Sequence, residues 1–290
     1  MIDLIDSHCH LEKYIHAGSI DNVLNAAKES GVARMIAVGT DFADWRLYHD
    51  LANKYKEQIY YAIGIHPSHV DNTWVSQSQI IAPFFSEEIK PLAIGEIGLD
   101  YYHLPADPKE RAYTIELQKT AFKMQLSLAL QFDVPIIVHS RSSFNDCVHL
   151  IDQSGVDWNK VVFHCFVEGP EQIKILNERG GRASFTGIIT YKNGEIVRQA
   201  VLSQGLDKLM LETDTPYLSP VPFRGKENRP AYLRQIAEFS ATLFGMELPD
   251  FARIITKNTE DFFGIKSLVQ QDQSANRLDP LVNHKKDISN

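Results

Sequence analysis

The chain has 290 residues, of which 44% are hydrophobic and 23% are charged, and its formal net charge is −8. This length suffices for one large α/β domain or two smaller ones, and the composition is that of a globular protein that buries its core without disulfides. The negative charge excludes a general binder of polyanions, so contact with nucleic acid requires a local basic patch or bound cations.

Two further features bear on the compartment. The cysteines Cys9, Cys147 and Cys165 are odd in number and widely spaced, which favours a reducing environment over a disulfide framework. The first residues, Met1–Asp6, carry neither a basic region nor a long apolar run, and no window reaches the length of a membrane span. We therefore expect a cytoplasmic protein with no membrane association and no obligate protein partner.

Short β-branched segments alternate with helical segments over residues 1–264. The predicted strands are Ile2–Asp6, Arg34–Val38, Tyr60–Ile63, Leu92–Glu96, Pro135–His139, Val161–His164, Ala183–Thr186 and Lys208–Glu212. The helices predicted after them are Ser19–Ser30, Ala43–Lys56, Gln77–Ile89, Glu110–Phe132, Phe144–Gln153, Gln172–Arg179, Glu195–Gln204 and Ala231–Phe244. Eight such couplets predict an α/β fold of the TIM (β/α)8 barrel type, although alternation alone also fits an open doubly wound sheet.

The end of the chain differs from this pattern. Pro249–Phe263 predicts an extra C-terminal helix, while residues 265–290 are rich in Gln, Asn, Asp and Lys. Such a composition buries too little apolar surface to offset the entropy of ordering. We therefore predict a hydrolase domain over residues 1–264 and a disordered tail over residues 265–290.

Side chains able to bind metal follow the predicted strands, at the end where barrel enzymes build their sites. His8 and His10 alternate with Cys9, so in extended chain both imidazoles lie on one face, although two incidental histidines would give the same short pattern. Glu96 ends an apolar strand, where an unpaired carboxylate is costly, so it is either metal-bound or paired with a Lys or Arg.

Two later strands each end in one histidine, His139 and His164, and the eighth leads into Glu212 and Asp214. Equivalent positions in successive units make coincidence improbable. His66 follows the third strand and is interpreted as a phosphate contact, a ligand or a turn residue. The six strongest candidate ligands are His8, His10, Glu96, His139, His164 and Asp214. Their imidazoles and carboxylates suit Zn, Mn, Fe or Ni, and the carboxylates also suit Mg. Six ligands are more than one open catalytic site needs.

Seven ordered blocks carry a resemblance to a known family. They are Asp6–Leu11, Gly64–Pro67, Ala93–Tyr101, Val138–Arg141, His164–Phe166, Leu211–Leu218 and Pro222–Pro230. In this order the chain resembles the TatD family of metal-dependent deoxyribonucleases, in the amidohydrolase superfamily, over residues 1–264. Val167–Gly169 departs from the family pattern, which has a small polar residue before the glycine, and the tail after Gly264 has no counterpart.

The resemblance implies two divalent metal ions per subunit, of Mg, Mn or Zn. It assigns His8, His10 and Asp214 to one ion and His139 and His164 to the other, with Glu96 bridging. Two ions activate a water and stabilise the attacking and leaving oxygens of a phosphodiester. We therefore expect catalytic roles for Asp214, which would orient or deprotonate that water, and for the bridging Glu96.

The remaining expectations concern the substrate. Glu212 is expected to hold a ligand histidine in one tautomer. Arg141, Arg224, Lys226 and His66 are candidate contacts to substrate phosphates, the alternative for Arg224 and Lys226 being solvated loop charges. The predicted function is hydrolysis of nucleic acid, as a DNase acting on DNA strand ends. The alternatives are a hydrolase of an ester or amide, such as an aminoacyl ester, and a non-enzymatic binding protein.

Overall fold

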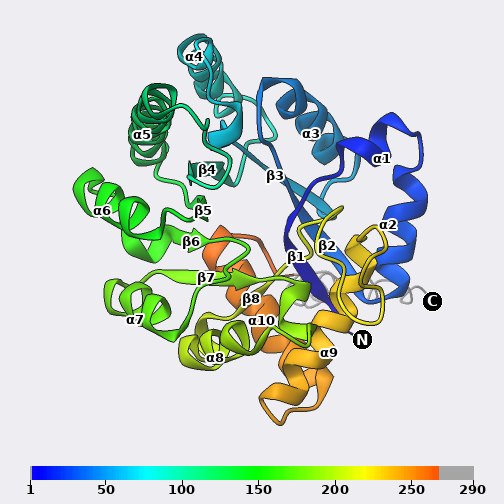
Figure 1. Cartoon of the computed structure of the whole chain (residues 1–290). Helices are drawn as coiled ribbons and strands as arrows, with labels where there is room; N and C mark the ends of the chain where they lie inside the picture. The colour runs from blue at the N-terminus through cyan, green and yellow to red at the C-terminus, as the bar shows by residue number, and fades with distance from the viewer. Residues whose placement is uncertain (1, 268–290) are drawn as a thin grey trace, which may run out of the picture.

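The computed structural model describes residues 2–267, so the predicted tail lies outside the described residues except for its first three positions. Eight parallel strands follow one another in chain order around a barrel, with helices on the outside (Figure 1). The strands are β1 (Leu4–Cys9), β2 (Val32–Val38), β3 (Ile59–Ile63), β4 (Ala93–Asp100), β5 (Ile136–Arg141), β6 (Val161–Phe163), β7 (Arg182–Phe185) and β8 (Met210–Leu211). The predicted TIM barrel is thus confirmed.

Hydrogen bonds between the ends of β1 and β8 close the ring. Asp214 N donates to His8 O at 3.0 Å, and His10 N donates to Thr215 O at 2.8 Å. Thr213 adds two hydrogen bonds to the buried Asp6 carboxylate, from its backbone N at 2.9 Å and its hydroxyl at 2.6 Å. An open doubly wound sheet has no such bonds between its first and last strands, so the alternative topology is wrong.

The helices on the outside agree with the predicted ones to within a few residues. They are α1 (Glu12–His16), α2 (Ile20–Glu29), α3 (Phe42–Lys54), α4 (Trp74–Phe84), α5 (Pro108–Phe132), α6 (Phe144–Ser154), α7 (Pro170–Arg179), α8 (Glu195–Gln204), α9 (Leu233–Leu243) and α10 (Leu248–Phe263). The short helix α1 had not been predicted. Within residues 2–267, every helix is too short or too polar to cross a membrane.

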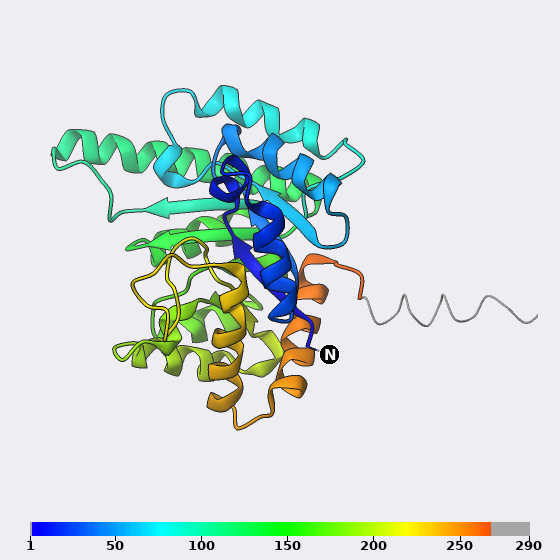
Figure 2. The same cartoon turned by 90° about the vertical axis from the view of Figure 1, so that its right-hand side faces the viewer.

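The helix α10 packs across the base of the barrel, at the N-terminal ends of the strands (Figure 2). Phe262, Phe263 and Ile265 join the apolar side chains that fill the barrel interior, among them Ile36 and Met210. Ile265 is therefore part of the core, although it falls in the segment predicted as a tail. The base is closed by packing, which leaves the opposite end of the barrel for a site.

Candidate metal centre

Five different strands bring the six predicted ligands to the mouth of the barrel, at the C-terminal ends of the strands. His8 lies on β1, Glu96 on β4 and His139 on β5. His10, His164 and Asp214 follow β1, β6 and β8 within three residues of each strand end. Every strand of a parallel barrel ends at this face, so side chains distant in sequence converge there.

The path of β4 directs Glu96 into the mouth. Ile94 lies opposite Ile136 and Ile97 lies opposite Val138, so β4 carries one extra residue between them and bulges at Gly95–Glu96. Bulges of this kind commonly re-aim a side chain beside an active site. Gly98 then has φ 143°, and a Cβ there would lie 2.0 Å from His139 O. Glycine is therefore required where β4 passes β5.

One oxygen of Glu96 faces the β1 histidines. Glu96 Oε2 lies 3.4 Å from His8 Nε2 and 3.7 Å from His10 Nε2. Asp214 Oδ1 approaches the same two nitrogens, at 3.9 Å from His8 and 3.5 Å from His10. His10 is held by its other nitrogen, Nδ1, which lies 2.9 Å from Val38 O. His8, His10 and Asp214 thus form one group of ligand atoms with Glu96.

The second oxygen of Glu96 faces a different set of imidazoles. Glu96 Oε1 lies 2.7 Å from His164 Nε2 and 2.8 Å from His139 Nδ1. It also lies 3.3 Å from His66 Nε2. His66, expected at the substrate, therefore stands within the ligand cluster itself. The sequence offered only its position after β3, which does not distinguish a phosphate contact from a ligand.

The chemistry of the cluster fits divalent cations. Three sets of ligand atoms each lie within 4.8 Å of one another, and they are His8–His10–Glu96, His8–His164–Asp214 and His66–Glu96–His139. Three buried imidazole nitrogens, His8 Nδ1, His139 Nε2 and His164 Nδ1, have no hydrogen-bond partner among the described residues. Each is the ring nitrogen opposite the one that faces Glu96, and two of them have a carboxylate nearby, so the fit to a metal rests on the nitrogens that converge on Glu96. Because the sets overlap at His8 and Glu96, spacing alone does not divide the residues between two ions.

Electrostatics of the cluster also favour a bound cation. Burial alone would raise the pKa of Glu96, but the imidazoles of His164 and His66 hold it well below its ordinary value. Burial likewise opposes the charge on His10, yet its hydrogen bond with Asp214 and the charge of Glu96 raise its pKa to about 9. Burial lowers the pKa of His8. The ionised carboxylates thus stabilise positive charge on the neighbouring imidazoles. A metal ion would supply that positive charge in place of the protons.

Two carboxylates stand behind the ligand histidines. Glu212 Oε1 lies 3.7 Å from His164 Nδ1, and its Oε2 accepts a hydrogen bond from Ser184 at 2.6 Å. Glu212 therefore faces His164, but at a distance longer than a hydrogen bond, and its expected role in fixing the tautomer remains a prediction. Asp100 had not been singled out, yet its Oδ2 lies 3.4 Å from His139 Nε2 and 2.8 Å from His103 Nδ1. Asp100 lies at the end of the strand that carries Glu96, four residues after it. This position could have identified Asp100 from the sequence as a second carboxylate at the mouth.

Of the expected phosphate contacts, Arg141 ends β5, and Arg224 and Lys226 lie in the loop after β8. The Arg141 guanidinium stacks on the ring of Tyr102 at 4.1 Å, and that of Arg224 stacks on Tyr191 at 4.3 Å. Lys226 is exposed, in the loop that follows β8. Figure 2 shows this loop, in yellow, on the side toward which β4 and β5 point. These cations therefore border the ligand cluster instead of entering it.

Comparison with known proteins decides the family. The model of the family described as TatD related DNase matches residues 5–264. The chain belongs to the TatD family. A relative from Escherichia coli K12, described as the uncharacterized metal-dependent hydrolase YcfH, is 33% identical over 273 residues, covering 90% of this chain and 96% of its own.

Two further TatD relatives bear on structure and activity. The crystal structure of YJJV, a TatD homolog from Escherichia coli K12, has a TM-score of 0.82 at 26% identity and covers 91% of this chain and 98% of its own. A protein of Erwinia tasmaniensis described as the 3'-5' ssDNA/RNA exonuclease TatD is 27% identical over 250 residues, covering 84% of this chain and 93% of its own. This TatD-family chain is accordingly a metal-dependent hydrolase.

Proposed function

We propose that this chain hydrolyses phosphodiester bonds at the ends of DNA strands, with two divalent ions of Mg, Mn or Zn at the barrel mouth. The observation that carries the proposal is the orientation of Glu96, which presents Oε2 to His8 and His10 and Oε1 to His139 and His164. A carboxylate placed in this way would offer one oxygen to each of two ions. In this assignment Asp214 completes the first site.

The bound ions would supply Lewis-acid stabilisation of the phosphoryl oxygens and a lowered pKa for the attacking water. Asp214 is the better placed of the two cluster carboxylates to accept that water's proton. Its side chain is 12% exposed, against 4% for Glu96. Burial would raise the pKa of Asp214, but the hydrogen bond with His10 and the charge of His8 lower it, so the group is ionised and able to act as a base.

Three of the histidines have a polar group behind the ring. Glu212 faces His164, Asp100 faces His139, and Val38 O faces His10 Nδ1. Such contacts orient metal-binding imidazoles and raise their basicity. The proposed site therefore has its ligands positioned before any substrate binds.

Two observations support nucleic acid as the substrate: the charged side chains around the barrel mouth and the description of one relative. Arg141, Arg224 and Lys226 offer charged donors to phosphates around a mouth that otherwise gathers carboxylates. The Erwinia relative described as an exonuclease on single-stranded DNA and RNA supports nucleic acid as the substrate class. A recessed mouth admits a strand end more easily than the middle of a duplex.

The direct test is incubation of the full chain with end-labelled single-stranded and double-stranded oligonucleotides, with each divalent metal and with a chelator. We expect metal-dependent shortening from strand ends, fastest on single strands. The absence of cleavage with Mg, Mn, Co and Zn would overturn the proposal. Hydrolysis of a small ester or amide in the same preparations would then favour the alternative substrate class.

A further inference from the structure

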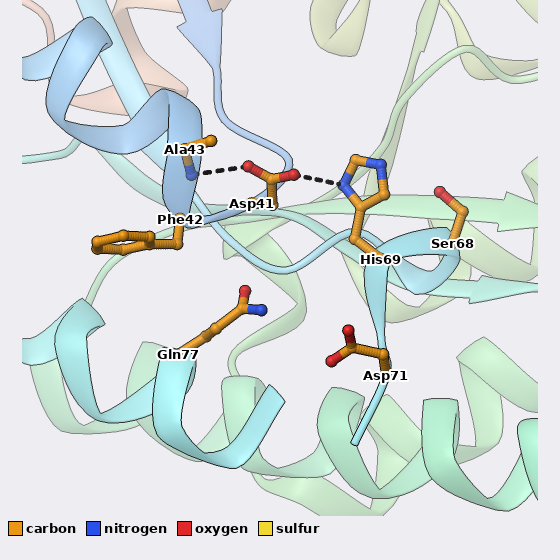
Figure 3. A pocket seen from close by; sticks show the side chains of 7 residues that line it. All are labelled: Asp41, Phe42, Ala43, Ser68, His69, Asp71 and Gln77. Atoms are coloured by element: carbon orange, nitrogen blue, oxygen red, sulfur yellow. Dashed lines mark hydrogen bonds and ion pairs between the residues drawn. The ribbon is translucent and has the colours of Figure 1, made fainter. Parts of the chain in front are cut away.

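A cavity of about 420 Å³ opens beside the metal centre, between the loop after β2 and the loop after β3 (Figure 3). Its walls are formed by Asp41, Phe42, Ala43, Ser68, His69, Asp71 and Gln77. Both loops leave the C-terminal ends of their strands, so the cavity lies on the face of the barrel that carries the six ligands. None of its lining residues belongs to the metal centre described above.

A pair of histidines separates the cavity from the metal centre. The ring of His69, which lines the cavity, lies 5.9 Å from the ring of His66. His66 Nε2 in turn lies 3.3 Å from Glu96 Oε1. A nucleotide whose phosphate is held at the metal centre therefore has this cavity next to it.

The lining combines an aromatic face with hydrogen-bonding groups. The Phe42 side chain remains 51% exposed at the entrance of α3, and its ring is supported edge-on by the buried Trp45 at 6.2 Å. Figure 3 shows Gln77 and Asp71 on the opposite wall, with the Gln77 side chain extending toward the cavity. Gln77 Nε2 donates to Thr73 Oγ1 at 2.9 Å, while Gln77 Oε1 has no hydrogen-bond partner among the described residues.

The charges of the lining argue against phosphate as the occupant. Asp41 and Asp71 are both carboxylates, and the one imidazole on the wall, His69, is paired with Asp41 at 3.3 Å. Carboxylates repel phosphate but accept hydrogen bonds from amino groups. An exposed phenyl ring beside such acceptors suits a flat heterocycle that carries N–H donors.

We propose that this cavity binds an unpaired base of the nucleic acid substrate. Phe42 stacks on the base, and Gln77 Oε1 and the second oxygen of Asp71 accept hydrogen bonds from its edge. The first oxygen of Asp71 already accepts from Thr73. Asp41 accepts from Ala43 N and pairs with His69. Cytosine, adenine and guanine carry an exocyclic amino group with two N–H donors, whereas thymine offers only its N3–H to these acceptors, so the subsite favours the first three bases. The inference rests on the proposed nuclease function. It also explains a preference for single strands, because their unpaired bases are free to enter the cavity.

The experiment measures binding and hydrolysis separately. Binding is followed by fluorescence anisotropy of a labelled single-stranded oligonucleotide with Mg²⁺, in the full chain carrying Asp214→Asn so that the probe stays intact. Phe42→Ala is added to this background, and Leu202→Ala, an exposed apolar side chain on α8, serves as the matched control. Phe42→Ala should weaken binding roughly fivefold or more, the effect of losing one stacked base. Leu202→Ala should change nothing.

Probes that lack a terminal base locate the effect. With an oligonucleotide that is abasic at both ends, Phe42→Ala and the background protein should bind equally. A loss of the same size with abasic and complete probes would overturn the subsite. Asp71→Asn sharpens the assignment, because it should reduce the preference for probes ending in dC, dA or dG over probes ending in dT.

The two proposals fail in different ways. If the wild-type chain cleaves oligonucleotides and Phe42→Ala leaves both binding and KM unchanged, the base subsite is wrong and the nuclease function stands. If binding depends on Phe42 but no metal supports cleavage, the nuclease function is wrong and the cavity remains a base-binding site. A melting curve for each variant verifies that the exposed substitutions leave the fold unchanged.

Discussion

The two ends of the barrel both bury charge, but they treat it differently. At the base, Arg34 is fully buried and its Nη2 contacts Asp3 at 2.7 Å and Glu260 at 2.8 Å. Its Nη1 also donates to Lys266 O at 3.3 Å. At the mouth, Glu96 and Asp214 stand among five imidazoles, each with a nitrogen 2.7–3.9 Å from one of these two carboxylates. The base pairs one guanidinium with two carboxylates, whereas the mouth brings two carboxylates together with five imidazoles, the donor types that suit a metal ion.

This difference separates stability from activity. A buried ion pair whose partner is removed leaves an uncompensated charge, so substitutions at the base should unfold the protein. A cluster of carboxylates and imidazoles arranged around a metal serves activity more than stability, so single substitutions there should affect chemistry instead. The following predictions test that separation, beginning with the largest effect.

Asp214→Asn should lower the turnover number for oligonucleotide hydrolysis by roughly 10²–10⁴-fold, the usual contribution of a general base. The amide keeps the shape of the side chain but cannot accept a proton, and it removes a negative charge that balances the cations. Circular dichroism and thermal unfolding should show an intact fold. A turnover number within tenfold of wild type would remove Asp214 from the chemistry.

Arg34→Ala should destabilise the fold by about 3–5 kcal/mol, because it leaves Asp3 and Glu260 without their counter-charge at the base. The measurement is chemical denaturation, with turnover expressed per folded molecule and expected to be unchanged. Arg253→Ala is the control, since Arg253 forms an exposed pair with Asp250 on α10 and such pairs contribute little. Equal destabilisation by both variants would show that the base carries no special charge network.

Asp100→Asn should lower metal affinity or activity by roughly 10–100-fold, the range found when a residue behind a metal-binding histidine is replaced. The reason is its contact with His139 Nε2, which orients the ring. The informative readout is metal affinity by calorimetry, which a merely structural role would leave unchanged. Asp261→Asn is a suitable control, because Asp261 pairs with Lys257 on α10, at the other end of the barrel.

Arg224→Ala should mainly raise KM, by a few-fold, because the side chain lies on the rim and contacts the Tyr191 ring instead of the metal ligands. A phosphate contact is weakened by salt, so the difference from wild type should shrink as ionic strength rises. Nearly unchanged kinetics at low salt would show that Arg224 is only a solvated loop charge.

The sequence predicted the fold well, because apolar strands and amphipathic helices have local patterns. It also predicted which side chains meet at the mouth, because parallel strands share one end. It missed the length of β4, which continues to Asp100 through a bulge that only the pairing with β5 reveals. It also overextended β8, whose observed span is Met210–Leu211 because the chain turns away after Leu211 toward β1.

Contacts made by loops were the least predictable. The position of His66 beside Glu96 depends on the turn after β3, and no periodic pattern encodes that turn. The cavity near Phe42 likewise forms only where two loops meet. Asp100 was accessible to the same reasoning as Glu96, since both lie on one strand four residues apart. Side chains on a strand or within three residues of its end were thus predictable, and those placed by longer loops were not.

The central claim is that Glu96 joins two ions at the mouth, and metal stoichiometry tests it most directly. Metal content per chain, measured by mass spectrometry after reconstitution and removal of free metal, should be two in the wild type. It should fall to about one in His139→Ala/His164→Ala, and Glu96→Ala should weaken retention of both ions. Retention of a single ion by the wild type, or of two by the His139→Ala/His164→Ala variant, would contradict the bridged pair.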